Sequence, residues 1–186
     1  MKTTSILELA LIGLLQQRPQ SGYDLRKTFV TTAMRHLSDS PGSIYPALRR
    51  LEARGWIAPN PAAANQPANA RGRQEFHLTA AGEAILVDWL QQPVTRHDVI
   101  WRNFELMLRF AFMDGNVPRS YALRFLDRLE QEQGIYVEEL RADLAHMRSL
   151  VPVHTGVLAF QSGILGMDAL IDWARRARAL LTEDSR

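Results

Sequence analysis

The chain has 186 residues, 46% of them hydrophobic and 23% charged, which is ordinary for a globular protein and allows one domain or a small domain with an extension. It contains no cysteine, so a disulfide framework and a thiolate zinc site are excluded. The longest apolar stretch, residues 6–15, includes Glu8 and is too short to span a bilayer, and no small-residue cleavage site follows Lys2. We therefore expect a cytoplasmic protein without a membrane partner.

Charge is distributed unevenly along the chain, although the net charge is only +2. Residues 1–78 carry ten Lys and Arg against five Asp and Glu, whereas residues 79–186 carry twelve against fifteen. A basic N-terminal part and an acidic C-terminal part are typical of a nucleic-acid-binding domain joined to a part that does not touch nucleic acid.

The first predicted helix covers residues 5–17. Ser5 and Glu8 have the spacing of a capping box, in which the Glu8 side chain reaches back to the Ser5 N–H. Apolar residues occur on nearly all sides of this helix, which predicts that it is the central buried helix of the first domain. Pro19 ends it.

Ser21 and Asp24 form a second capping-box pattern, which begins a helix that runs to about Thr32. In a helix-turn-helix the first of the two helices crosses the phosphate backbone. Tyr23 and Lys27 are therefore candidate phosphate contacts. Tyr23 would equally well cover the edge of the core.

A third helix follows the polar turn at residues 40–43. We expect Ser43 as its N-cap, Pro46 in its first turn, where a missing N–H is harmless, and Gly55 just beyond its end in the left-handed conformation. Apolar residues at i, i+4 and i+7 give it one buried face: Ile44, Leu48 and Leu51.

The opposite face of this helix carries small hydroxyls first, then an aromatic side chain, then arginines. A helix that enters a major groove needs about this order, because its N-terminal residues meet base edges and its later cations meet phosphate. The alternative is a solvated basic face on a buried helix. The candidate DNA contacts are Ser40, Ser43, Tyr45, Arg49 and Arg50.

A wing is predicted after this helix. A strand begins at residues 56–57, and alternating apolar side chains predict a second strand over residues 74–79. The Pro-, Asn- and Ala-rich residues 58–73 between them lack periodicity and read as a long loop. Arg71 and Arg73 would lie near its tip, where they would enter a minor groove or meet phosphate. The alternative is a disordered loop with incidental arginines.

Three motifs occur in order along this part of the chain: GYDL at residues 22–25, SIYPALRRLEARGWI at residues 43–57, and F-x-L-T-x-x-G at residues 76–82. From Ile6 to Gly82 the sequence resembles the PadR family of bacterial transcription regulators. The resemblance implies a winged helix-turn-helix followed by a C-terminal helical dimerisation region. It also implies that a response to phenolic acids or other aromatic compounds occurs in some members.

The second half is predicted to be helical throughout, and residues 91–98 are the predicted linker. We expect a mainly α protein: residues 1–92 form a winged helix-turn-helix with a two-stranded wing, and residues 99–186 form an all-helical dimerisation domain. The expected helices are 79–92, 99–113, 118–150 and 154–181.

These helices carry more apolar surface than one subunit can cover, and the third of them is longer than a small domain needs, so we infer a homodimer. Three glycines in the last helix would allow another helix to approach closely: Gly156, Gly163 and Gly166.

Enzymatic signatures are lacking in the sequence. No two of the five histidines have i, i+4 spacing, and there is no H-E-x-x-H, phosphate-cradling glycine loop or G-x-S-x-G. The acidic residues between 130 and 143 alternate with arginines, which predicts a solvated face rather than a metal site. We expect no enzyme activity, no cofactor and no metal.

The candidate effector-binding residues, at the dimer interface, are Trp101, Phe104, Met107 and Trp173; the alternative is that they are packed core. The predicted function is that of a homodimeric, sequence-specific regulator of transcription. It would be a repressor that binds a palindromic operator in double-stranded DNA and is released by a small aromatic effector. The alternative is a winged-helix protein-interaction module without DNA readout.

Overall fold

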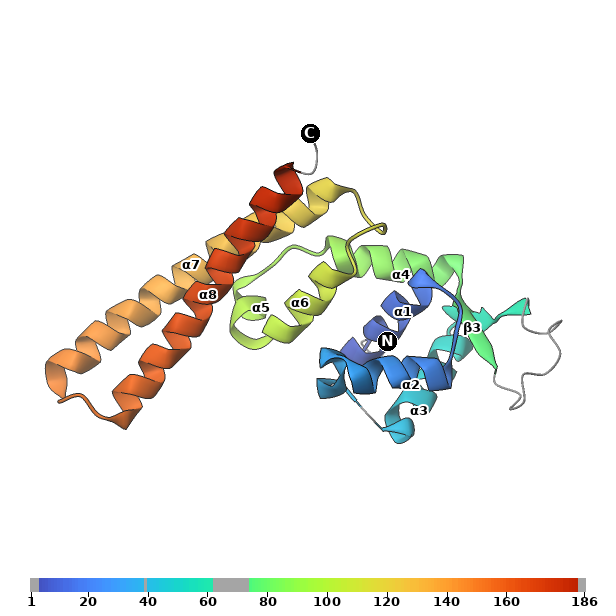
Figure 1. The fold of residues 1–186 in the computed structure, drawn as a ribbon, viewed down its shortest axis with the longest axis horizontal. Coiled ribbons are helices and arrows are strands. Elements are labelled where there is room, and N and C mark those ends of the chain that lie inside the picture. The colour runs from blue at the N-terminus through green and yellow to red at the C-terminus, as the bar shows by residue number, and fades with distance from the viewer. Residues whose placement is uncertain (1–3, 39, 62–73, 184–186) are drawn as a thin grey trace. The chain divides into compact units, whose positions relative to one another are not determined.

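The structure is a computed structural model that describes residues 4–38, 40–61 and 74–183. The chain is divided into two compact units, Met1–Trp89 and Leu90–Arg186 (Figure 1).

Helix α1, Ile6–Gln17, is the central helix of the first unit, as predicted. Its capping box is formed: the Ser5 N–H donates to Glu8 Oε2 over 3.0 Å and the Glu8 N–H donates to Ser5 Oγ over 3.3 Å. Every residue from Glu8 to Leu15 is buried. Near the C-terminal end of α1, Gln20 Nε2 donates to the carbonyl of Leu14 over 2.8 Å.

Helices α2, Gly22–Thr31, and α3, Pro41–Ala53, form the helix-turn-helix pair, with a short 3-10 helix, Ala33–His36, between them. The start of α3 differs from the prediction. Ser40 is the N-cap, since its Oγ accepts from the Gly42 N–H over 3.1 Å, and the φ that proline imposes favours the first helical position. Pro46 consequently lies inside the helix rather than in its first turn, and Ser43 does not cap it.

Helix α3 ends at a glycine, as predicted. Gly55 has φ of 71°, and its N–H donates to the carbonyl of Glu52 over 2.8 Å. The next N–H, of Trp56, donates to the carbonyl of Leu51 over 3.0 Å. These two bonds form a Schellman motif, which turns the chain sharply into the wing.

The sheet has three antiparallel strands in the order β1-β3-β2, whereas two were predicted. Strands β2, Ile57–Pro59, and β3, Glu75–Leu78, form the wing, and β1, Gln20–Ser21, pairs with the other edge of β3. Strand β1 is only two residues long, too short for the alternation that reveals a strand in a sequence.

Helix α4, Ala80–Gln91, follows the wing. Helices α5, Arg96–Trp101, and α6, Asn103–Ala111, come next, where one helix over residues 99–113 was predicted. The break is at Arg102, whose φ of −128° and ψ of 30° are not helical. Helix α5 begins inside the predicted linker, because a capping box between Thr95 and Asp98 opens it.

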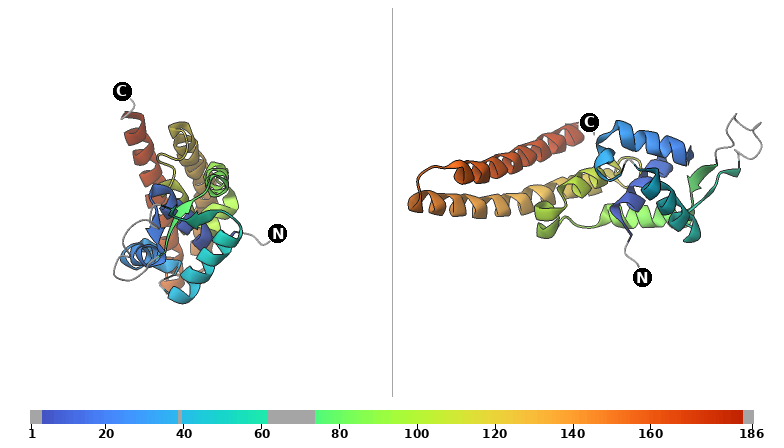
Figure 2. Two further views of the ribbon diagram at one scale, coloured as in Figure 1. Left: turned by 90° about the vertical axis from the view of Figure 1, so that its right-hand side faces the viewer. Right: turned by 90° about the horizontal axis from the view of Figure 1, so that it is seen from below.

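The long helices α7, Arg119–Leu150, and α8, Thr155–Glu183, lie side by side as an antiparallel hairpin (Figure 2). At 1.5 Å per residue, the 32 residues of α7 span about 48 Å. The buried residues of α7 include Val137 and the polar Gln133. The core of the hairpin is Val137, Leu144, Val157, Ile164 and Ile171.

One side of α8 is not covered within the described chain. Leu158, Leu165 and Leu180 are exposed, and an added Cβ at Gly163 or Gly166 would meet nothing within 4 Å. Among the described residues α8 is the one helix with the length and apolar composition of a membrane span, with 22% of its most apolar window buried. Helices from the cores of water-soluble proteins also reach that composition. Among the described residues no other helix makes the close approach predicted at Gly163 and Gly166.

Candidate nucleic-acid interface

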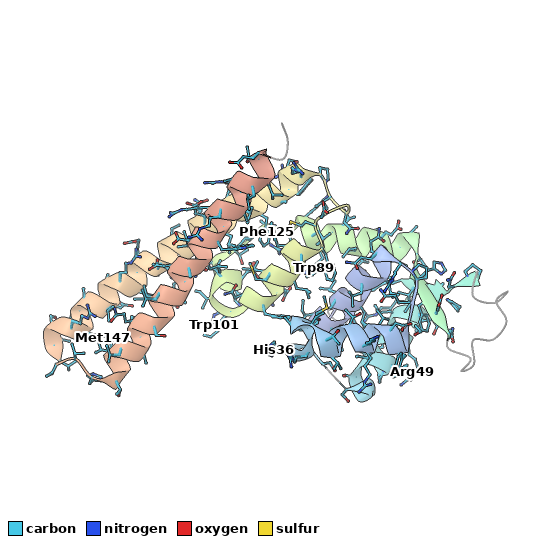
Figure 3. All side chains as sticks on the ribbon, in the orientation of Figure 1. His36, Arg49, Trp89, Trp101, Phe125 and Met147 are labelled. Carbon is cyan, nitrogen blue, oxygen red and sulfur yellow. The ribbon has the colours of Figure 1, made fainter. Side chains whose placement is uncertain are left out.

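The outward side of α3 presents Tyr45 and Arg49. Tyr45 is 41% exposed and Arg49 is exposed, and Figure 3 shows Arg49 on α3. The opposite side is buried, since Ile44, Leu48 and Leu51 lie in the core as their spacing predicts. The apolar side of α3 therefore fixes which side chains face outward.

The two serines at the start of α3 are engaged within the turn. Ser40 accepts from Gly42, as described above, and Ser43 Oγ donates to the Ser40 carbonyl over 2.9 Å. Ser43 also shares a short hydrogen bond with the hydroxyl of Ser38. Both predicted DNA contacts thus stabilise the N-terminal end of the helix.

Arg50 is held by a buried carboxylate rather than left free beside Arg49. Its Nε donates to Glu8 Oε1 over 2.7 Å, and Arg54 Nη1 donates to Glu8 Oε2 over 3.3 Å. Glu8 is only 2% exposed, and Arg54 also lies 4.9 Å from the centre of the Trp56 ring. The cluster joins α1 to the C-terminal end of α3 and the start of the wing.

The pKa of Glu8 results from opposing influences. Burial raises it, but the hydrogen bonds from Ser5 and Arg50 and the positive charges of Arg54 and Arg50 outweigh burial and lower it below 4.5. Glu8 therefore carries a negative charge at neutral pH. The sequence did contain a signal for this cluster. It was an acidic residue within an otherwise apolar run, together with two arginines four residues apart farther along the chain.

Four of the predicted DNA contacts remain: two residues of α2 and the two arginines at positions 71 and 73. Tyr23 and Lys27 are both exposed on α2. Tyr23 therefore does not lie inside the core. Arg71 and Arg73 lie outside the described residues.

The predicted effector residues occupy different surroundings. Trp101, at the end of α5, is 76% exposed. Phe104 and Met107 are partly buried on α6. Trp173 packs edge-on against Phe110 at 5.3 Å between ring centroids. Because Phe110 in turn lies 5.6 Å from Phe125, Trp173 belongs to an aromatic cluster.

Two features nearby were not predicted. Arg109 is buried with its guanidinium 4.9 Å from the centre of the Phe125 ring, and within the described chain its Nε and Nη2 have no hydrogen-bond partner. Burial lowers the pKa of Arg109, against the charges of Asp98 and Glu105. A separate pocket of about 170 Å³ is lined by Leu90, Val94, Met113, Tyr121, Arg124 and Phe125, among others.

The acidic residues of α7 pair with arginines, as expected of a solvated face. Arg175 Nε donates to Glu130 over 2.7 Å and Arg178 Nη1 to Asp127 over 2.6 Å. In the described ranges there is no group of three His, Cys, Asp or Glu side chains that could hold a metal ion.

Comparison with known proteins connects this geometry to a family. Residues 11–88 match the sequence model of the "Transcriptional regulator PadR-like family". The "Negative transcriptional regulator PadR" of Bacillus subtilis (strain 168) is 25% identical over 188 residues, which cover 96% of this chain and 99% of that protein.

Solved structures that resemble the chain include Bacillus subtilis PadR in complex with operator DNA, at 21% identity and a TM-score of 0.43, covering 95% of this chain and 99% of that one. The same protein in complex with p-coumaric acid matches at 20% identity and a TM-score of 0.41, covering 96% and 99%. By the family match residues 11–88 resemble the PadR-like family of transcriptional regulators.

Proposed function

We propose that the chain is a repressor that binds a palindromic operator as a homodimer, with α3 in the major groove. The observation that carries this proposal is the outward side of α3, where an exposed arginine follows a half-exposed tyrosine on a helix fixed by its buried apolar side. Tyr45 would contact base edges and Arg49 would neutralise phosphate. The relative named as a negative regulator supports repression.

The homodimer is proposed from the uncovered side of α8. Exposed leucines lie there among Gly163 and Gly166, where an added Cβ would meet nothing within 4 Å in the described part of the chain, and a second copy would cover both kinds of residue. Two α3 helices related by twofold symmetry would then read half-sites about one DNA turn apart, ~34 Å, or a multiple of that distance. We place this regulator in the cytoplasm, where its DNA is.

Selection of bound fragments from random or genomic DNA tests the proposal. We expect enrichment of one palindromic sequence, with an affinity that falls steeply with salt because phosphate contacts release counterions. A winged helix used only as a protein-interaction module would bind every fragment weakly and with a shallow salt dependence, and this result would contradict the proposal.

We further propose that a small aromatic effector releases the operator. The aromatic residues of the second unit support it, as does the complex of the Bacillus subtilis protein with p-coumaric acid. Titration of the protein–operator complex with aromatic acids tests this step separately. If no such compound changes operator affinity while the selected sequence still binds, the effector is wrong and the DNA-binding function stands.

A further inference from the structure

Gly22, the first residue of α2, lies directly against the ring of Tyr45 on α3. A Cβ atom at Gly22 would be 2.7 Å from Cε1 and 3.3 Å from Cδ1 of Tyr45, and 3.2 Å from Cδ1 of Leu48. A separation below 3.0 Å is essentially never found for a real Cβ. Only a residue without a side chain leaves room for the ring where it stands.

The backbone gives no other reason for a glycine here. Gly22 does not have a positive φ; among the described residues only Gly55 and Gly115 do. Within a helix, glycine is less favourable than alanine by up to about 1 kcal/mol. Local conformation would therefore favour alanine at this position, and contact with the Tyr45 ring favours glycine.

An added methyl group would displace Tyr45 rather than unfold the domain. Leu48, the other neighbour, is buried in the core and cannot move freely. Tyr45 is 41% exposed, so its ring can swing towards solvent at little cost. In the described part of the chain no hydrogen bond holds the Tyr45 hydroxyl, which leaves packing to fix the position of the ring.

We infer that Gly22 is a positioning residue for DNA recognition: by seating the Tyr45 ring, it sets where that side chain meets the bases and so determines part of the sequence preference. This inference rests on the proposed function. It assigns a specificity role to α2, the helix otherwise expected to contact only phosphate.

The test compares the selected duplex with a scrambled duplex of the same composition. Gly22→Ala should bind the selected duplex roughly tenfold more weakly, the loss typical of one misplaced base contact. Binding to the scrambled duplex and the salt slope should change little, because phosphate contacts are intact. The melting temperature should change little, because the preference of alanine for the helix offsets the close contact with Leu48.

A double-mutant cycle supplies the control. In a Tyr45→Ala background the added methyl has no aromatic ring to displace, so Gly22→Ala should then leave both affinities unchanged. An equal loss on both duplexes, or an undiminished loss in the Tyr45→Ala background, would overturn the inference. If the unaltered chain shows no preference between the two duplexes, the proposed function itself is wrong.

Discussion

Gly82 packs against the backbone carbonyl of Trp56, and a Cβ on Gly82 would lie 2.1 Å from that oxygen. Thr79 forms the same junction: its hydroxyl donates to the Gly55 carbonyl over 2.7 Å and its N–H donates to the Trp56 carbonyl over 3.1 Å. The end of α3, the root of the wing and the start of α4 thus meet backbone to backbone. This contact gives the T-x-x-G motif its physical reason.

Gly82→Ala should destabilise the chain strongly, by about 3–5 kcal/mol, because a carbonyl cannot move aside as a flexible side chain can. Denaturant unfolding measures the loss. Gly134→Ala in α7 is the matched control, since a Cβ there meets nothing within 4 Å and should be neutral or slightly stabilising. Equal effects of the two variants would refute the contact.

Glu8→Gln should lower the free energy of unfolding by about 1–3 kcal/mol at pH 7. Two arginines lose their buried counter-charge, while glutamine still completes the capping box. The pKa of Glu8 lies below 4.5 in the folded chain. The contribution of its charge is therefore complete above that pH and is lost as the pH falls through the lowered pKa.

Unfolding curves of the unaltered chain and of the Glu8→Gln variant between pH 7 and pH 3 check this pH dependence. The difference in unfolding free energy should shrink in acid. Glu52→Gln, on the exposed side of α3, should show no comparable loss. A difference that stays constant down to pH 3 would mean that the Glu8 charge does not matter.

Arg49→Ala and Arg50→Ala should separate a DNA contact from a structural ion pair. Arg49→Ala should flatten the salt slope of DNA binding by about one unit and leave the melting temperature unchanged. Arg50→Ala should lower the melting temperature and change the slope less, because its Nε is bonded to Glu8. Titrations at several salt concentrations with thermal melts would reveal the reverse pattern if the assignment were wrong.

Leu165→Glu should dissociate the proposed dimer, because it places a charge on the uncovered side of α8. Light scattering should then give the monomer mass of 21.1 kDa in place of twice that value. Ala145→Glu on the exposed side of α7 is the control and should remain dimeric. An unaltered chain that is already monomeric at micromolar concentration would contradict the dimer.

Features that depend only on the spacing of nearby residues could be predicted from the sequence. The capping box at Ser5, the apolar positions of α3 and the terminal glycine Gly55 are each decided by residues within a few positions of one another, and all three are confirmed. The start of α3 was missed because each of two serines, Ser40 and Ser43, is followed by a proline that fits the first turn of a helix.

Features that depend on distant residues could not be predicted. The hydrogen bond between Arg50 and Glu8 joins residues 42 positions apart. The contact of the Tyr45 ring with Gly22 depends on how two helices cross. The break at Arg102 lies within an apolar run that fits one helix equally well. The first two features arise from tertiary contacts, which local spacing does not contain.

The two strands of the wing are held together up to residues 60 and 75. Pro59 is paired with Phe76 in the ladder, and Asn60 donates its N–H to the Glu75 carbonyl over 2.9 Å and its Nδ2 to the Glu75 carboxylate over 3.1 Å. Doubling the length of a loop with fixed ends costs only about 0.6 kcal/mol. An affinity tag or a fluorescent reporter inserted between residues 61 and 74 would therefore leave the frame intact, which makes the wing a convenient place to attach a probe of DNA binding.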